Sequence, residues 1–279
     1  VTFMIHDILP VTKNHFFPPG SNESFSAWLN IIIEYSDKII CVTDAVVSEV
    51  KKYILSKKLD NPRLQLEYSH HGADISSTIP SGGINSGDVD KVNLIKQNLS
   101  FLMVGTLEPR KGHLQTVAAF ELLWAAGNES HLVIVGKEGW KGLPDDARRT
   151  IPEIVDTIKN HPLLNKKLFW FDNASDELLN ELYQNADCLL YPSEDEGFGL
   201  PLIEASQHNK PLISRDVPVL REVAGEGAFY FQSNRPEVLA RAIEEWIELF
   251  KNNAHPDSAE ISWLSWAQSA ENLVKKLFD

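Results

Sequence analysis

The sequence is poor in cysteine and has no long apolar run. Its two cysteines, Cys41 and Cys188, lie far apart in strand-like apolar stretches, which indicates neither a disulfide framework nor a Cys-x-x-Cys metal site. We expect two packed thiols in a reducing compartment. No apolar stretch approaches the ~18 residues of a membrane-spanning helix. The opening VTFMIHD also lacks the charged and apolar regions of a signal peptide. These absences predict a cytoplasmic protein.

Basic residues are also scarce. The chain has 26 Lys and Arg against 39 Asp and Glu, a formal net charge of −13. Nonspecific binding to nucleic acid requires a basic face that displaces counterions from phosphates. We therefore expect no nucleic-acid partner, and any anionic ligand must meet a local basic site.

What the sequence does contain is an alternation of apolar strands and amphipathic helices. At 279 residues it exceeds the usual size of one domain, so two domains, or one domain and part of another, are expected. Apolar strands without period-2 alternation, separated by helices, are typical of a parallel sheet covered on both faces. We predict an α/β fold with a doubly wound parallel sheet, in which ligands bind beyond the carboxyl ends of the strands. The predicted helices include 25–35, 45–59, 112–127, 143–160, 175–186 and 235–251.

The chain has no initiator methionine and opens on a strand, so we expect a fragment of a longer protein. A polar tract, SSTIPSGGINSGD, begins at Ser76 and is predicted to be an exposed linker or flexible insertion. The resulting boundaries are an N-terminal domain over 1–75, a linker over 76–97, a C-terminal domain over 98–257 and a final helical segment over 258–279.

One short stretch, SEDEGFGLPLIEA over 193–205, follows an apolar strand. Gly197 and Gly199 let the backbone turn sharply and approach a ligand closely. Pro201 suits the first turn of a helix, so a helix is predicted to begin near Leu200. The free N–H groups and the positive dipole end of that helix would face the cleft and form a site for phosphate.

Charged side chains frame this predicted anion site. Glu196 stands before the turn, and Glu204 lies about one turn into the helix. In a second motif, GTLEPRKG, a strand ends at Gly105, and Arg110 and Lys111 follow where the next helix begins. Two cations at a second strand end could clamp a diphosphate. An anion flanked by hydroxyl groups is the ligand that this arrangement suits.

Five motifs in this order resemble a known family. EGFGLPLIEA, GTLEPRKG, LVIVGKEGW, SDELLNELYQNADCLLYPS and CVTDAVVSEV together resemble the retaining, nucleotide-sugar-dependent glycosyltransferases of the GT-B architecture, the Glu-x7-Glu group or glycosyl transferases group 1. That group includes bacterial mannosyl- and glucosyltransferases of surface polysaccharides such as lipopolysaccharide. The resemblance is strong from Asn98 to Phe231 and looser before Asp74. It implies that 98–257 binds the nucleotide sugar, that 1–75 is part of a Rossmann-like acceptor domain, and that the final helix crosses back to it.

The resemblance also implies roles for individual residues. Glu204 would hold the ribose diol, Glu196 would bind hydroxyls of the donor sugar, and the FDNAS stretch would lie near the base. His6, in IHDILP, matches the family's histidine near the transferred sugar. The implied catalytic residues are His6, Glu196, Arg110 and Lys111, and the implied donor-binding residues are Gly105, Gly136, Gly197, Phe198, Gly199, Leu200 and Glu204.

The implied reaction is transfer of a hexose to a glycan or lipid-linked acceptor with retention of configuration, and GDP-mannose is the first expectation for the donor. Retention in this family is framed as attack from the leaving-group side, with a phosphate oxygen taking the acceptor proton. Glu196 is therefore not assigned as a covalent nucleophile. No metal or other cofactor is expected, because Arg110, Lys111 and a helix N-terminus would stabilise the leaving phosphate. With a lipid-linked acceptor, the protein would work at the inner face of the membrane.

Several features have simpler interpretations. Taken alone, each of these charged residues could be an ordinary surface group. His70 and His71 are interpreted as part of a domain hinge rather than a metal site, and Asp88-Val89-Asp90 as a coincidence with the Asp-x-Asp motif of metal-dependent transferases. The glycines of GKEGWKG miss the GxGxxG spacing of a nicotinamide dehydrogenase. The basic helix that carries Lys51 and Lys57 is a solvated surface or, with a lipid-linked acceptor, a contact with an anionic membrane.

Two other functions stay open. The acceptor domain looks truncated, and catalysis in this architecture requires two domains that close over the donor, so the chain could be an inactive nucleotide-sugar-binding module. Sugar-nucleotide epimerases and phosphorylases share the architecture. The Glu-x7-Glu motif fits neither as closely, and the sequence offers no specific cofactor lysine for a phosphorylase.

Overall fold

The computed structural model describes residues 1–74 and 82–278, which build two parallel β-sheets. The N-terminal unit, residues 1–74, has a sheet in the order β1-β2-β3, made of β1 (Thr2–Ile5), β2 (Lys38–Cys41) and β3 (Gln65–Tyr68). Its helices are α1 (Leu9–Thr12), α2 (Ser21–Tyr35) and α3 (Asp44–Lys57), with a 3₁₀ turn η1 (Asn14–Phe16). Thr43 begins α3 as its N-cap, because its hydroxyl accepts the amide hydrogen of Val46.

The larger unit, residues 82–260, contains a six-stranded sheet in the order β6-β5-β4-β7-β8-β9, and every pair of neighbours is parallel. The chain moves outward from β4 to β6 on one side and from β7 to β9 on the other. The loops that follow β4 and β7 therefore leave in opposite directions and open a crevice at the carboxyl ends of these strands. The strands are β4 (Ser100–Val104), β5 (His131–Val135), β6 (Leu168–Phe171), β7 (Cys188–Tyr191), β8 (Leu212–Arg215) and β9 (Phe229–Phe231).

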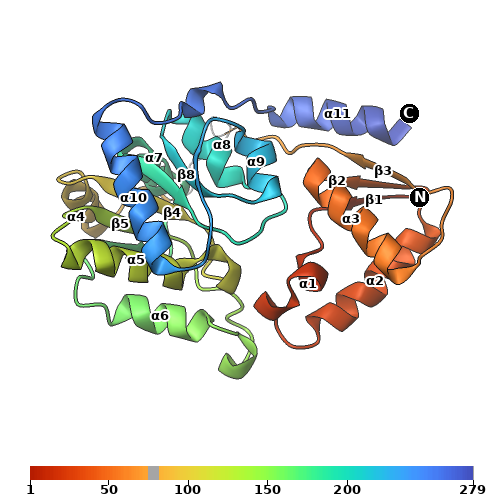
Figure 1. The fold of residues 1–279 in the computed structure, drawn as a ribbon, viewed down its shortest axis with the longest axis horizontal. Helices are drawn as coiled ribbons and strands as arrows, with labels where there is room; N and C mark the ends of the chain where they lie inside the picture. The colour runs from red at the N-terminus through yellow and green to blue at the C-terminus, as the bar shows by residue number, and fades with distance from the viewer. Residues whose placement is uncertain (75–81, 279) are drawn as a thin grey trace.

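Helices cover both faces of this sheet (Figure 1). One apolar core lies between the sheet and α5 (His113–Ala125), α6 (Ile151–Lys159) and α10 (Pro236–Lys251). The other lies under α4 (Ser86–Ile95), α7 (Asp176–Asn185), α8 (Leu200–Gln207) and α9 (Pro218–Ala224). Short 3₁₀ turns are η3 (Pro109–Lys111), η4 (Asp145–Ala147) and η5 (Ser258–Glu260). The α/β fold with a doubly wound parallel sheet is thus confirmed.

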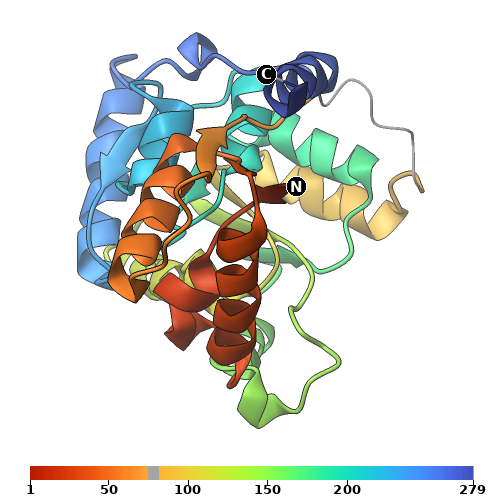
Figure 2. The same ribbon diagram turned by 90° about the vertical axis from the view of Figure 1, so that its right-hand side faces the viewer.

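The end of the chain returns to the N-terminal unit. Helix α11 (Trp266–Phe278) runs along that unit in both ribbon views (Figures 1 and 2). The Ser269 hydroxyl donates to the His70 carbonyl over 2.7 Å, and Lys38 Nζ donates to the Lys276 carbonyl over 2.6 Å. The Lys276 ammonium in turn lies 2.9 Å from a carboxylate oxygen of Glu67. The final helix therefore connects the two units.

Two expectations from the sequence are wrong in part. The tract predicted as a linker over 76–97 forms helix α4 from Ser86, and Val92 and Ile95 of this helix are buried in the core of the larger unit. The earlier part of that tract, up to residue 81, lies outside the described residues. The helix predicted over 143–160 begins only at Ile151, because Pro152 lacks an N–H group and fits only the first turn of a helix.

Other expectations concern single residues. Cys41 and Cys188 are buried free thiols, as predicted, and burial raises the pKa of Cys41 to about 12. Asp88 and Asp90 lie on α4, where the Asp88 carboxylate accepts hydrogen bonds from Asn85 and Lys91. Within the described residues, no helix has the length and apolar character to cross a membrane.

Candidate functional site

The carboxyl ends of β4 and β5 approach each other closely at the crevice. A Cβ atom added to Gly136, just after β5, would lie 1.9 Å from the Gly105 carbonyl oxygen, just after β4. Only glycine fits at position 136 for this reason. A Cβ on Gly105 would lie 3.5 Å from Cε of Lys111, so the lysine side chain passes over this bare backbone. The two predicted donor-site glycines thus form the floor on which Lys111 lies.

Glu196, Arg110 and Lys111 form one ion cluster. Arg110 Nη1 lies 2.6 Å from Glu196 Oε2, and Lys111 Nζ lies 2.5 Å from Glu196 Oε1. The Tyr191 hydroxyl donates to the same Oε1 over 3.0 Å. Arg110 also pairs with Glu108 at 3.1 Å and donates to the Asp195 carbonyl. The turn η3 delivers both cations to the loop that follows β7.

Glu196 and Arg110 favour each other's charged form. Burial alone would raise the pKa of Glu196, but Lys111 and Arg110 outweigh burial and lower the pKa to about 2. Burial would lower the pKa of Arg110, and the Glu196 and Glu108 carboxylates reverse this and raise it. The cluster therefore keeps two cations at the strand ends at neutral pH, and a diphosphate could take the place of the carboxylate as their partner.

Helix α8 begins beside this cluster. Gly199 is its N-cap residue with φ of 105°, in the left-handed region that favours glycine, and Pro201 lies in the first turn. No side chain of the described residues caps this helix end, so its N–H groups are open to an anion. A Cβ on Gly197 would lie only 2.2 Å from the His6 carbonyl oxygen, and Thr43 donates to the Gly197 carbonyl over 3.1 Å. The glycine-rich loop is therefore packed directly against the N-terminal unit.

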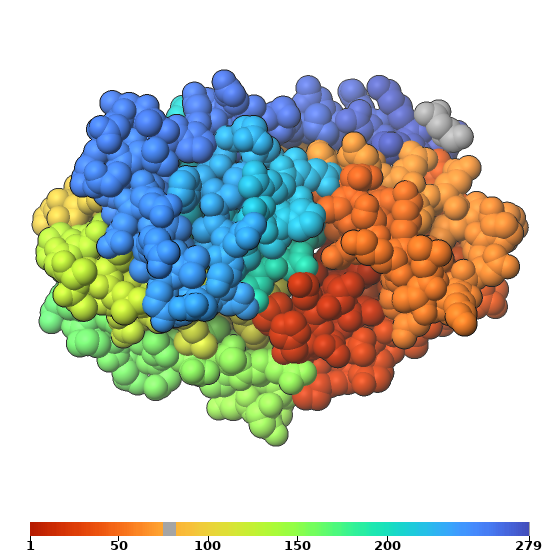
Figure 3. All heavy atoms as spheres, in the orientation of Figure 1, coloured from red at the N-terminus to blue at the C-terminus, as the bar shows by residue number. Residues whose placement is uncertain are grey.

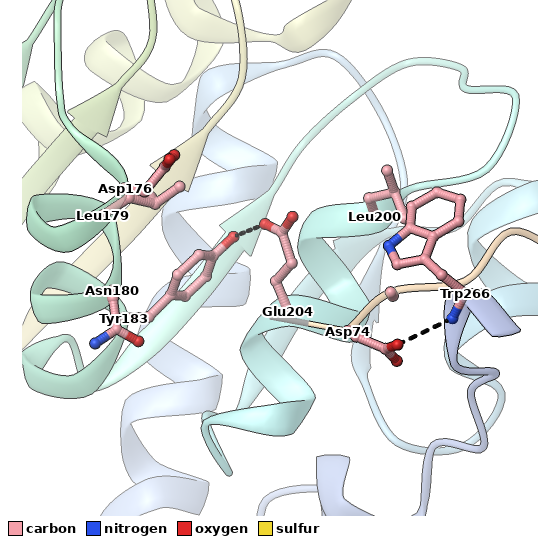
Figure 4. A pocket seen from close by; sticks show the side chains of 9 residues that line it. Asp74, Asp176, Leu179, Asn180, Tyr183, Leu200, Glu204 and Trp266 are labelled. Atoms are coloured by element: carbon pink, nitrogen blue, oxygen red, sulfur yellow. Dashed lines mark hydrogen bonds between the residues drawn. The ribbon is translucent and has the colours of Figure 1, made fainter. Parts of the chain in front are cut away.

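Glu204 lies in a separate cavity of about 230 Å³ (Figure 4). The Tyr183 hydroxyl of α7 donates to Glu204 Oε2 over 2.7 Å. Burial raises the pKa of Glu204, and this hydrogen bond opposes the rise. Leu200 and the indole of Trp266, whose amide donates to Asp74, form another part of the cavity wall. The cavity thus combines a carboxylate that accepts hydrogen bonds with apolar and aromatic surfaces.

The His6 side chain lies at the end of β1 in the N-terminal unit. Its Nδ1 is 3.2 Å from Nε2 of His71, and the two rings are stacked with centroids 5.1 Å apart. The His71 ring meets Phe198 of the glycine-rich loop edge to face at 5.3 Å. Burial, with His6 and His70 nearby, lowers the pKa of His71. The His6 side chain therefore reaches the glycine-rich loop through His71 and Phe198.

The structure brings most of the predicted residues to one crevice. Arg110, Lys111 and Glu196 are in direct contact, whereas Glu204 lines its own cavity, one turn into α8. Three residues that contact the predicted ones were not themselves predicted as site residues, namely Tyr191, Tyr183 and His71. The only sequence signal for Tyr191 was its place at the last position of an apolar strand, next to the loop.

The geometry defines a class of protein: two α/β units that meet at the carboxyl ends of parallel strands, the GT-B architecture. The chain belongs to the glycosyl transferases group 1 family, whose sequence model matches residues 87–260. The family and the fold that the motifs predicted are thereby confirmed. Retention of configuration and the donor base stay predictions.

The chain is similar to several characterised proteins. It is 44% identical over 278 residues to the serotype-specific mannosyltransferase WbdA of Escherichia coli, covering 99% of this chain and 33% of WbdA. It is 28% identical over 233 residues to the O-antigen chain mannosyltransferase RfbU of Salmonella typhimurium, covering 82% of this chain and 56% of RfbU. Among solved structures, Anabaena HepE in complex with UDP and glucose superposes with a TM-score of 0.71 at 16% identity, covering 100% of this chain and 71% of HepE. The chain thus spans about a third of the length of WbdA.

Proposed function

We propose that the chain transfers a mannosyl group from GDP-mannose to a glycan or lipid-linked acceptor of surface polysaccharide synthesis, with retention of configuration. The observation that carries the proposal is the Glu196, Arg110 and Lys111 ion cluster between bare strand ends and the start of α8. The names of WbdA and RfbU, both mannosyltransferases, support mannose as the hexose.

In this proposal each side chain has a task that its surroundings suit. Lys111, Arg110 and the N-terminus of α8 bind the diphosphate and stabilise the charge that develops on it. Glu196 accepts hydrogen bonds from hydroxyls of the donor sugar, and Glu204, positioned by Tyr183, accepts those of the ribose. The bond between C1 of the sugar and the phosphate oxygen breaks, the acceptor oxygen bonds to C1 on the same face, and the acceptor proton passes to a phosphate oxygen. We propose that no metal takes part, since the chain supplies the cations for the leaving phosphate.

Calorimetric titration of GDP, UDP, ADP and their hexose conjugates tests the donor site. We expect micromolar binding of GDP and GDP-mannose, a loss of about tenfold or more in Lys111→Ala, and a comparable loss in Glu204→Ala, since each removes about 1.4 kcal/mol or more of polar interaction. Glu244→Ala, an exposed carboxylate on α10, serves as the matched control and keeps wild-type affinity. Unchanged binding in both site variants would overturn the assignment of the site.

One observation favours a second candidate, a nucleotide-sugar-binding module without activity. The chain spans 33% of WbdA, so residues needed for transfer could lie elsewhere in such a protein. Mass spectrometry of a mixture of protein, GDP-mannose and a mannose oligosaccharide separates the two candidates. A product longer by one hexose supports the transferase, and donor binding without such a product supports the module.

For a lipid-linked acceptor, we propose that helix α3 touches an anionic membrane. Lys51, Lys57 and Lys58 are exposed there, beside the exposed Leu55. Clustered lysines and an apolar side chain on one helix are typical of a surface that binds anionic lipid. Sedimentation with phosphatidylglycerol vesicles, compared with neutral vesicles, is the corresponding measurement.

A further inference from the structure

A second and larger cleft lies between the two units. Its volume is about 970 Å³. Residues of α3 and β3 line it on the N-terminal side, and Glu194, Asp195 and the first residues of α9 line it on the other. Figure 3 shows this side of the molecule, where the orange surface of α3 meets the cyan surface around α9. Because Asp195 directly precedes Glu196, the cleft begins where the proposed site of the donor sugar ends.

Carboxylates outnumber cations in this cleft. Two of its cations are already paired: Arg221 bonds Asp216 at 2.7 and 3.1 Å, and Lys13 lies 3.6 Å from Asp195. A phosphate or carboxylate on a ligand would therefore face a net negative wall. The carboxylates are Asp44, Glu49, Glu194, Asp195 and Glu222, and the cations are Lys13, Lys52 and Arg221.

Glu49 on α3 is the carboxylate that stands out. It is half-buried, and within the described residues no hydrogen bond or ion pair engages its oxygens. Burial, with the nearby Asp195 and Asp7, raises its pKa to about 7, against the opposing charges of Lys13 and Lys52. Placing a carboxylate out of water without hydrogen-bond donors is unfavourable. Hydroxyl groups of a ligand in the cleft would supply the missing donors to Glu49.

An apolar surface completes the cleft. Tyr68, the last residue of β3, is 41% exposed and lines the same cavity. The face of an aromatic ring suits the C–H groups of a sugar, and its hydroxyl suits the polar edge. Carboxylates for hydroxyl groups together with an aromatic wall fit a carbohydrate better than they fit a lipid chain or an anion.

We propose that this cleft binds the acceptor and that the acceptor ends in an uncharged sugar, whose hydroxyl groups donate to Glu49 and Asp195 beside Tyr68. The inference rests on the proposed function, because it names the acceptor class of that reaction. This acceptor class distinguishes the chain from transferases whose acceptor is a sugar phosphate or a polyol phosphate. Such an acceptor would need several free cations, and of the three cations that line this cleft only Lys52 has no ion pair within the described residues.

The test is saturation-transfer NMR with two ligands: the methyl glycoside of a mannose disaccharide, and the same disaccharide carrying a phosphate ester. The wild-type chain is compared with Glu49→Gln and Asp195→Asn, which keep side-chain size, and with Glu244→Gln as the control on α10. We expect binding of the neutral disaccharide only, weakened at least fivefold in both cleft variants and unchanged in the control. The melting temperature and the GDP affinity of each variant verify that its fold is intact.

Three outcomes would overturn the inference: equal or tighter binding of the phosphorylated sugar, undiminished binding of the neutral sugar in both cleft variants, or no sugar binding at all. Titration of GDP in the same samples keeps the two proposals apart. If the disaccharide binds as expected and GDP does not, the donor site is wrong and the acceptor cleft stands. If GDP binds and the disaccharide does not, the acceptor cleft alone is wrong.

Discussion

Three carboxylates near the crevice differ in pKa because their surroundings differ. Two buried cations lower the pKa of Glu196 to about 2, so it is ionised at any physiological pH. Burial raises the pKa of Glu204, which has only the Tyr183 hydroxyl to oppose it, and raises that of Glu49 to about 7. The carboxylate nearest the proposed diphosphate site is thus the one whose ionised form is favoured, and burial works against the ionised form of the other two.

Glu49 gives a prediction for stability against pH. Its pKa in the folded chain, about 7, lies above the ordinary value of 4.5, so folding is opposed above pH 7 and unaffected below about pH 4.5. Glu49→Gln should therefore raise the melting temperature at pH 8, by about 2 °C for about 1 kcal/mol after allowance for solvent screening. It should have little effect at pH 4.5, where Glu49 is protonated in the folded chain and about half protonated in the unfolded chain. Calorimetric scans at both pH values measure this, with Glu244→Gln unchanged at either pH; equal shifts at both would contradict the pKa assignment.

The sequence could predict residues in motifs but not residues that become neighbours through folding. Glu196, Arg110 and Lys111 belong to two contiguous motifs, and both follow apolar strands, so their convergence at one sheet edge follows from the parallel topology. Glu49 and Tyr183 are single polar positions on amphipathic helices, where period and spacing mark them only as helical residues. The residues that act on them come from other elements: the Asp195 carboxylate lies near Glu49, and Glu204 accepts from Tyr183. No local pattern reveals such pairs.

Among the elements, β4 and β5 depend on glycine most directly. Gly136→Ala would place a methyl group 1.9 Å from the Gly105 carbonyl oxygen, where neighbouring strand ends leave no room to move. Overpacking of this kind destabilises proteins by about 3 kcal/mol, so we expect the melting temperature to fall by about 5 °C or more. Gly142→Ala is the matched control, because its Cβ would meet no atom within 4 Å. A melting temperature equal to that of the control would show that the strand ends can separate.

Helix α4 was predicted from the sequence to be part of a linker. Its sequence, SGDVDKVNLI, has a glycine and two aspartates and follows a Gly-Gly pair, which are features of a loop. Two features favour the helix: Asn85 caps its N-terminus, and the helix buries its own Val92 and Ile95 in the core of the larger unit. Tertiary burial thus overcomes weak helix propensity, and only the apolar pair one turn apart hinted at it.

At the scale of the whole molecule, the two units interlock at the glycine-rich loop and at Glu222. The Glu222 carboxylate of α9 accepts the Asp44 and Ala45 amide hydrogens at the start of α3, each over 2.8 Å, and lies 2.7 Å from His70 Nε2. A carboxylate from one unit thereby caps a helix of the other. These contacts join the two units together with α11 and with further bonds, such as the ion pair of Lys13 with Asp195 and the hydrogen bond from Gln207 to the Ala73 carbonyl.

Gly197→Ala should loosen this interlock without damaging either unit. Its methyl group would lie 2.2 Å from the His6 carbonyl oxygen, so the units must move apart by about 1 Å, a displacement that costs catalysis on the order of a hundredfold when it misplaces reacting groups. We expect faster amide hydrogen exchange in residues 5–8 and lower turnover, with GDP affinity retained. Gly142→Ala again serves as the control. Unchanged exchange and turnover would show that the contact is not required.

The ion cluster at Glu196 also affects how the donor binds and how the nucleotide product leaves. In the described structure the carboxylate occupies the cations that a diphosphate would use, so an arriving donor must displace it from Lys111 and Arg110. Once displaced, Glu196 keeps the Tyr191 hydroxyl but loses both cations, so it is a poorly compensated buried anion unless sugar hydroxyls also donate to it. A nucleoside diphosphate without a sugar supplies no such hydroxyl groups to Glu196, whereas the intact donor does. The spent nucleotide should therefore leave more readily than the donor, and the chain would resist inhibition by its own product.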